Sequence, residues 1–332
     1  MLEAGVAAIR TIKLEREFKG GVKAVGGVDL EIAPGEVYGF LGPNGAGKTT
    51  TVRMLVTLLR PTGGEAQVAG FDVAREPDAV RRNIGVALQD AALDPLMTGR
   101  ELIELQAKLH GIAPSKVTSR ARTLIERVGL VEAQDRRVGT YSGGMRRRLD
   151  LAMALIHSPD VLFLDEPTTG LDPVSRLTLW EEVRRLKHEG TTVFLTTQYL
   201  EEADQLADRV GIINAGLLVA EGTPAALKAQ VGQPHLEIAL IDGADREAAS
   251  VVLARFGAAR PPSDGFELSV ALAQGATEIA PVVLALDESG FQVASLQLVN
   301  PTLDDVFVEK TGRHLEGAGG GEDEAETDAA RP

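Results

Sequence analysis

The chain has 332 residues, of which 44% are hydrophobic and 25% charged, and its formal net charge is −14. This composition excludes a disordered chain, and the acidic balance argues against a protein that binds nucleic acid by neutralising phosphates. The sequence contains no cysteine, which excludes disulfides, thiolate metal sites and thiol chemistry. It also lacks both an apolar run of about 18 to 20 residues and a signal-peptide pattern, so we expect a cytoplasmic chain. Its length predicts about two domains.

Hydrophobic patterns predict alternating strands and helices along the first two thirds of the chain. Short alternating runs predict strands over residues 9–40, and apolar residues at helical spacing predict a helix over 49–59. Residues 99–157 are predicted to be mostly helical. The apolar runs 161–164 and 192–195 are typical of buried strands in a parallel sheet with helices on both faces. We therefore expect an α/β fold.

The composition changes after Pro224. Residues 235–312 contain strand-like and helix-like runs in the order β-α-β-α-β, which is typical of a small α+β domain. The last residues are mainly Gly, Ala, Asp and Glu, and such a segment buries too little apolar surface to fold. We expect a first domain over 1–230, an accessory α+β domain over 231–314 and a disordered acidic tail over 315–332.

A glycine-rich loop lies between the strand-like run 37–41 and the predicted helix. Residues 42–49 match G-x-x-x-x-G-K-[ST] at every fixed position, and we call them the P-loop. Its main-chain N–H groups can surround a phosphate, Lys48 would reach the β and γ phosphates, and the Thr49 hydroxyl would hold Mg²⁺. This context disfavours the alternative of a glycine-rich turn that binds nothing. The predicted nucleotide contacts are Gly42, Pro43, Asn44, Gly45, Ala46, Gly47, Lys48, Thr49 and Thr50.

Two carboxylates, Asp165 and Glu166, follow the apolar run 161–164. Ligands of open parallel sheets bind outside the carboxyl ends of the strands, so both acids can reach phosphates held by the P-loop. We predict that Asp165 holds Mg²⁺ and that Glu166 accepts a proton from an attacking water. Alone, such a pair is more often a solvated strand end; together with Lys48 it favours a nucleotide site.

The segment Tyr141-Ser142-Gly143-Gly144-Met145 precedes a predicted helix. It resembles the Leu-Ser-Gly-Gly-Gln signature of the ATP-binding cassette (ABC) family, with Tyr in place of Leu and Met in place of Gln. Ser and Gly are also ordinary N-cap residues, but their place between the P-loop and the two carboxylates favours an anion site. The resemblance implies a P-loop NTPase fold with a RecA-like parallel core, an antiparallel β subdomain and a helical subdomain at about 92–157.

The resemblance also implies roles for residues outside these motifs. Phe18 matches the aromatic residue that stacks on adenine, Gln89 the glutamine that contacts Mg²⁺ and senses the membrane subunit, and Asp172 the D-loop aspartate. Gln198 stands where the family usually has a histidine that contacts the γ-phosphate. A Gln amide can donate a hydrogen bond to phosphate but cannot become cationic. We therefore expect Gln198 to keep a positioning role while Glu166 acts as the base.

The segments 141–150, 195–204 and 301–307 resemble drug-resistance ATPases of the daunorubicin-exporter type. This resemblance implies an ATP hydrolase that uses ATP and Mg²⁺ and forms a homodimer in which Ser142–Gly144 of one copy closes on the ATP held by the other. The dimer would drive a separate polytopic membrane permease that exports a drug-like or lipophilic substrate. The resemblance also implies a peripheral location on the inner face of the cell membrane, and we expect no nucleic-acid partner.

Two alternatives stay open at this point. A soluble ABC ATPase acting on DNA or ribosomes is disfavoured by the single cassette and the charge of −14. A nucleotide-gated regulatory module without turnover is favoured only if Gln198 and Met145 disable the site. The basic run 146–148 is more typical of solvated or interface charge than of nucleic-acid contact. The residues identify neither the transported substrate nor the permease.

Overall fold

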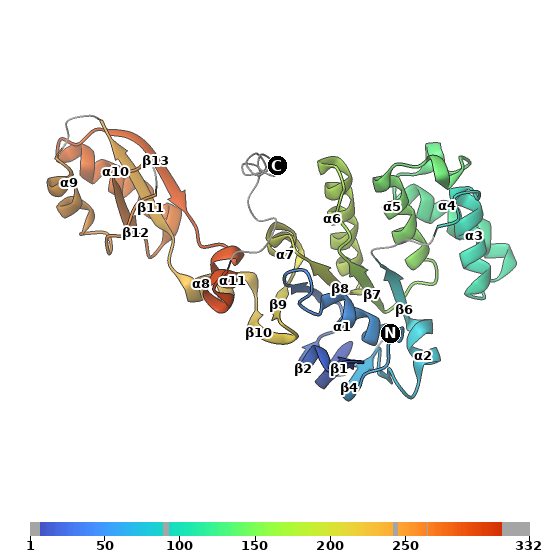
Figure 1. The fold of residues 1–332 in the computed structure, drawn as a ribbon. Coiled ribbons are helices and arrows are strands. Elements are labelled where there is room, and N and C mark those ends of the chain that lie inside the picture. Colours follow the sequence, from blue (N-terminus) through green and yellow to red (C-terminus); the bar gives the residue numbers. More distant parts are fainter. Residues whose placement is uncertain (1–6, 89–92, 242–244, 264, 314–332) are drawn as a thin grey trace, which may run out of the picture. The chain divides into compact units, whose positions relative to one another are not determined.

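The computed structural model describes residues 7–88, 93–241, 245–263 and 265–313 (Figure 1). Within them the chain divides into a first compact unit that runs up to Pro224 and includes Arg313, and a second unit, Ala225–Gly312. The predicted division between 230 and 231 lies inside helix α8 (Pro224–Val231). The predicted acidic tail at 315–332 lies outside the described residues.

A six-stranded sheet forms the centre of the first unit, in the order β10-β9-β3-β8-β7-β6. Five of its strands are parallel, and β10 is antiparallel to β9. The strands are β3 (Val37–Leu41), β6 (Ile84–Ala87), β7 (Val161–Asp165), β8 (Thr192–Thr197), β9 (Arg209–Asn214) and β10 (Leu217–Gly222). β3, β7 and β8 are buried along their whole length, and their carboxyl ends lie in register, with Leu41 opposite Thr197 and Asp165 opposite Thr196.

A second, antiparallel sheet of four strands has the order β2-β1-β4-β5. Its strands are β1 (Ile9–Phe18), β2 (Val22–Ile32), β4 (Gly63–Val68) and β5 (Phe71–Asp72). The side chains of β7 alternate in direction, so Val161 and Phe163 share one apolar core with this sheet and with helix α1 (Lys48–Leu55). Helix α2 (Pro77–Asn83) follows β5.

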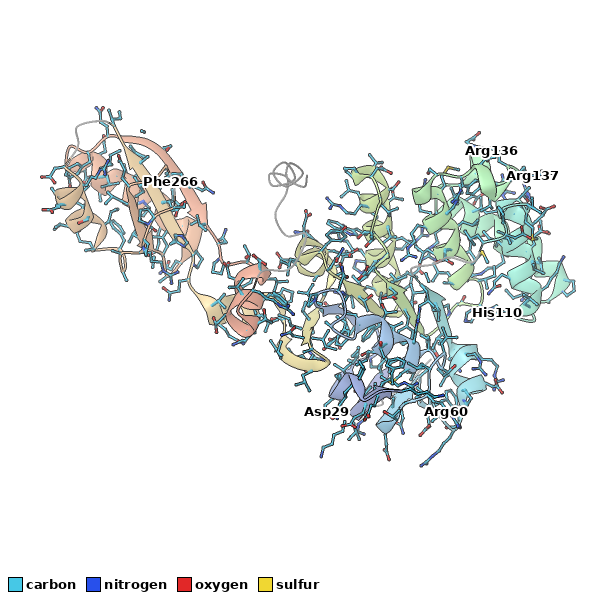
Figure 2. All side chains as sticks on the ribbon, viewed as in Figure 1. Asp29, Arg60, His110, Arg136, Arg137 and Phe266 are labelled. Atoms are coloured by element: carbon cyan, nitrogen blue, oxygen red, sulfur yellow. The ribbon has the colours of Figure 1, made fainter. Side chains whose placement is uncertain are left out.

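The other side of the central sheet is covered by helices (Figure 1). Leu162 and Leu164 of β7 belong to the core of this helical layer. The helices are α3 (Gly99–Leu109), α4 (Pro114–Arg127), α5 (Gly143–Ala154), α6 (Pro173–His188) and α7 (Leu200–Leu206), with 3₁₀ turns at Val131–Ala133 and Val138–Thr140. Figure 2 shows Arg136 and Arg137 on this layer and Asp29 and Arg60 beside the antiparallel sheet, on opposite sides of the unit.

The second unit is a three-stranded antiparallel sheet, in the order β12-β11-β13, packed against helices. Its core contains Leu236 and Ile238 from the sheet and Leu253, Val282 and Leu286 from two helices. The elements are β11 (His235–Leu240), α9 (Arg246–Leu253), β12 (Leu268–Ala271), a 3₁₀ turn at Gly275–Glu278, α10 (Ile279–Glu288), β13 (Val293–Val299) and α11 (Leu303–Thr311). The predicted α/β fold with a small α+β part is confirmed.

Candidate nucleotide-binding site

The P-loop connects β3 to α1, and its glycines are required by its shape. Gly45 and Gly47 have φ angles of 77° and 108°, in the left-handed region that favours glycine. A Cβ atom at Gly42 would lie 2.3 Å from the Ile213 carbonyl oxygen, and one at Gly47 would lie 2.5 Å from that of Ala24. The loop therefore has a tight path that brings main-chain N–H groups to the N-terminus of α1, where an anion is favoured. The other predicted contacts, Pro43, Asn44, Ala46 and Thr50, lie in this loop or in the first turn of α1.

Lys48 is the first residue of α1, and its side chain is 4% exposed. Its Nζ donates hydrogen bonds to the carbonyl oxygens of Gly42, at 2.7 Å, and Pro43, at 3.2 Å. The same ammonium lies 3.2 Å from Oε1 of Glu166, whose side chain is also buried. The structure thus brings the P-loop lysine and the predicted base together across the carboxyl ends of β3 and β7.

Asp165 ends β7 and is 1% exposed. Its Oδ1 accepts a hydrogen bond from the Thr196 hydroxyl, at 2.5 Å, and lies 3.4 Å from Oγ1 of Thr49. Its Oδ2 is buried and has no hydrogen-bond partner among the residues that the structure describes. A buried carboxylate oxygen without a donor needs compensation, and a hard cation would supply it.

The oxygen donors of Thr49 and Asp165 fit Mg²⁺, and they are too few for a cation that is held by protein ligands alone. Among the residues that the structure describes, no three His, Cys, Asp or Glu side chains gather into a metal site. Mg²⁺ is typically held by one or two protein oxygens together with water and substrate phosphates. The Thr49 hydroxyl and the free Asp165 oxygen match that pattern beside the P-loop.

Glu166 has a backbone conformation that is rare for a residue with a side chain. Its φ is 47°, in the left-handed region, and such strain is found most often at functional sites. Its N–H donates to the Thr196 carbonyl oxygen at 3.0 Å and lies 3.1 Å from the Thr196 hydroxyl. Thr196 therefore holds both acids of the site. This role was not predictable from the sequence, because a threonine inside an apolar strand has no distinguishing spacing.

The predicted signature and D-loop residues meet within one chain. Ser142 is exposed and caps α5, since its Oγ accepts a hydrogen bond from the N–H of Met145 at 3.2 Å. Asp172 caps α6 and accepts a hydrogen bond from the Ser175 hydroxyl at 2.6 Å, which lowers the pKa of Asp172 below its usual value. A Cβ atom at Gly144 would lie 2.6 Å from that same hydroxyl oxygen. A glycine at 144 thus permits the close packing of α5 against the start of α6.

Two further predicted residues, Phe18 and Gln198, take no part in these hydrogen bonds and ion pairs. Phe18 ends β1, is 39% exposed, and has its ring centroid 4.8 Å from the Arg16 guanidinium carbon. Gln198 is half-buried and follows β8 directly. Over the described ranges, neither side chain forms a hydrogen bond or ion pair with Lys48 or with the two acids of β7. Gln89 lies outside the described residues.

For one residue of the basic run 146–148, the interpretation as solvated or interface charge is wrong. Arg147 is not a solvated or interface charge, because it is 9% exposed and donates to three main-chain carbonyl groups around the site. Helical spacing provided a signal, since position 147 lies three residues after Gly144 and four before Leu151, and all three are buried on α5. This signal is hard to recognise in the sequence because position 147 lies between two other arginines.

The family model for ABC transporters matches residues 25–169, a range that contains the P-loop, Ser142 and both acids of β7. The daunorubicin resistance ATP-binding protein DrrA3 of Streptomyces coeruleorubidus is 49% identical over 88% of this chain and 92% of its own length. The daunorubicin/doxorubicin resistance ATP-binding protein DrrA of Streptomyces peucetius is 48% identical over 92% of each chain. The chain belongs to the ABC transporter ATP-binding family.

Solved structures of ABC cassettes share this fold. A dimeric cassette in a post-hydrolysis state, bound to ADP and Pi, superposes with a TM-score of 0.60 at 25% identity, covering 65% of this chain and 98% of that one. An ATP-binding subunit of an ABC transporter gives a TM-score of 0.62 at 24% identity, covering 74% and 98%. The predicted ABC cassette fold is confirmed, and the protein is a nucleotide-binding ATPase subunit of a transporter. Within the described part of this ABC cassette, no helix is long and apolar enough to cross a membrane.

Proposed function

We propose that this ABC ATPase powers the export of a drug-like or lipophilic substrate through a separate membrane permease. The observation that carries the proposal is the identity of 48% to 49% with proteins named for daunorubicin and doxorubicin resistance, over about nine tenths of each chain. Nod factor export ATP-binding protein I of Paraburkholderia xenovorans, 42% identical over 70% of this chain, also has a name that refers to export.

The contacts of Lys48, Thr49, Asp165 and Glu166 support the roles proposed for these residues, and the roles of Phe18, Gln89 and Gln198 rest on the family resemblance. The P-loop glycines and Lys48 bind the phosphates, Thr49, Asp165 and Gln89 hold Mg²⁺, and Phe18 stacks on the base. Mg²⁺ supplies charge neutralisation on the phosphate oxygens. Glu166 accepts the proton of the attacking water, and the Gln198 amide donates a hydrogen bond to the γ-phosphate.

The Lys48–Glu166 ion pair supports this division of roles. A carboxylate within hydrogen-bond reach of an attacking water can accept its proton, and the Lys48 ammonium holds the Glu166 carboxylate beside the P-loop. When Lys48 engages a phosphate, its charge is shared and Glu166 becomes available to the attacking water. The left-handed backbone of Glu166 fixes the direction of its side chain at the end of β7.

Two copies would form the active unit. Ser142, Gly143 and Gly144 lie at the N-terminus of α5, and Ser142 and Gly143 are exposed. An exposed helix N-terminus with a hydroxyl and free amides favours an anion, and in a two-fold homodimer it would close on the ATP held by the P-loop of the second copy. Asp172 would lie at the same interface. ATP would then favour the closed dimer because it contacts both copies.

The permease places this subunit at the inner face of the cell membrane, and the net charge of −14 disfavours nucleic acid as a partner. Co-purification tests this. The tagged protein is purified from its own cells in mild detergent, with a tagged unrelated protein of similar charge as the control. We expect a polytopic membrane protein in stoichiometric amount. Recovery of ribosomal proteins or DNA in its place would contradict the export proposal and favour a soluble ABC ATPase.

A regulatory module without turnover is the second candidate, and the Gln at position 198 is the observation that favours it. It predicts nucleotide binding with no phosphate release. Mg²⁺-dependent phosphate release by the wild-type protein separates the two candidates.

A further inference from the structure

Arg147 is a buried cation on α5, in the same helix whose N-terminus carries Ser142. Its Nε donates to the Pro167 carbonyl oxygen at 3.1 Å, one terminal nitrogen donates to the Asp165 carbonyl oxygen, and the other donates to that of Leu88. Asp150, one turn further along α5, lies 3.9 Å from this guanidinium. One side chain thus joins α5 to the segment 165–167 and to Leu88.

The three acceptors have positions that matter for hydrolysis. Asp165 and Pro167 are the residues on either side of Glu166, and Leu88 follows β6 directly. The peptide of Glu166 is also held from β8, because its N–H donates to Thr196. The backbone of Glu166, with its strained φ, is therefore fixed from two directions by hydrogen bonds that do not involve its own carboxylate.

Only arginine can make this set of contacts with one side chain. A guanidinium carries five N–H donors in a planar fork, whereas a lysine carries three donors on a single nitrogen. Three carbonyl groups that approach separate nitrogens of the fork cannot all be reached by one ammonium. Replacement by lysine would preserve the charge beside Asp150 and lose at least one of the three hydrogen bonds to main-chain carbonyl groups.

We propose that Arg147 is a positioning residue for Glu166, which ties the signature helix to the hydrolytic strand end of the same chain. Movement of α5 during closure on a second copy would then change the placement of the base. This inference rests on the proposed role of Glu166 and adds to it a specific link from α5. It concerns the rate of hydrolysis, because the hydrogen bonds of Arg147 go to residues 88, 165 and 167 and none of those described goes to the P-loop.

The test compares two arginine-to-lysine substitutions on the same helix. Arg148 donates to the carbonyl oxygens of Val128, at 3.0 Å, and Gly129, at 3.3 Å, both within the helical layer. R148K therefore makes the same change of side chain on the same helix without affecting the segment 165–167. For each variant, kcat and KM for ATP, the affinity for a fluorescent ATP analogue and the melting temperature are measured in the full-length protein.

We expect R147K to lower kcat at least tenfold while KM and nucleotide affinity change less than threefold, and R148K to keep kcat within threefold of wild type. In an E166Q background, R147K should cause no further loss. Arg147→Gln, whose amide keeps one donor nitrogen, is the second variant if R147K does not fold, and the same loss of kcat is expected.

Three results would overturn the inference: a wild-type kcat in R147K, an equal loss in R148K, or a loss of nucleotide affinity that parallels the loss of kcat. A wild-type protein that hydrolyses no ATP would instead contradict the proposed function itself, and this inference with it. Active wild-type protein with an unaffected R147K variant contradicts only the positioning role of Arg147.

Discussion

Asp150 is a largely buried carboxyl group that lies 3.9 Å from the guanidinium of Arg147. Burial raises the pKa of Asp150 from an ordinary 3.8 to about 6, although the neighbouring charge of Arg147 acts in the opposite direction. The carboxyl group is therefore easier to deprotonate in the unfolded chain than in the folded one. Its contribution to stability is fully present below the unfolded pKa and is lost as the pH rises through about 6.

The first prediction is a pH-dependent effect of Asp150→Asn. Because the amide does not titrate, the unfolding free energy of wild type relative to D150N should fall as the pH rises, by more than about 1 kcal/mol between pH 5 and pH 7.5 and by about 3 kcal/mol in the limit. Urea unfolding of both proteins across this range measures the difference. A difference that does not vary with pH would contradict the raised pKa.

The residues of the P-loop were predictable from the sequence, whereas Arg147 and Thr196 were not recognised. The glycine spacing encodes backbone geometry directly, since Gly45 and Gly47 have positive φ and Gly42 lies against the Ile213 backbone. The burial of Arg147 depends on which face of α5 meets β6 and β7, and that is a property of tertiary packing.

At the scale of elements, the order of strands and helices was predicted more accurately than their ends. The helix predicted over 49–59 begins at Lys48 and ends at Leu55, because Thr57 has a left-handed φ of 65° that cannot continue a helix. The β8 strand extends beyond the apolar run 192–195 to Thr197. The first difference arises from a backbone angle and the second from strand pairing at Thr196 and Thr197, and hydrophobic periodicity predicts neither.

The second prediction concerns the N-terminus of α5. Ser142→Ala removes an N-cap, and Thr98→Ala removes the matched cap of α3, so each should lower the unfolding free energy by about 1 kcal/mol. Only S142A should lower kcat for ATP, by tenfold or more, because only Ser142 has a proposed contact with nucleotide. Chemical unfolding and phosphate release measure the two quantities. Equal ATPase activity in both variants would show that Ser142 is a cap and nothing more.

At the scale of the whole molecule, the predicted site residues that the structure describes all lie in the first compact unit. The second unit, Ala225–Gly312, has its own apolar core. Two relatives that are 47% and 48% identical align with 93% and 92% of the chain, and therefore with most of this unit. Substrate recognition is left to the permease under this proposal, so the cassette supplies one function, the conversion of ATP hydrolysis into movement between two copies.

The third prediction tests whether the ATP site is shared between two copies. Lys48→Ala disables the P-loop and Ser142→Ala the signature, so each variant alone should be nearly inactive. In an equimolar mixture, half of the dimers would contain one intact site, formed by the P-loop of one copy and the signature of the other. The mixture should recover roughly a quarter of the wild-type rate. A mixture no more active than its components would contradict the shared site.

The central claim is that Lys48, Asp165 and Glu166 form a site that hydrolyses ATP, even though Gln stands at position 198. The most direct measurement is Mg²⁺-dependent phosphate release by wild type and by Glu166→Gln, with nucleotide affinity measured in parallel. The account predicts clear release by wild type, a loss of at least a hundredfold in E166Q, and ATP affinity within about threefold in both, as expected when a general base is removed. Near-background release by wild type that E166Q leaves unchanged would contradict it.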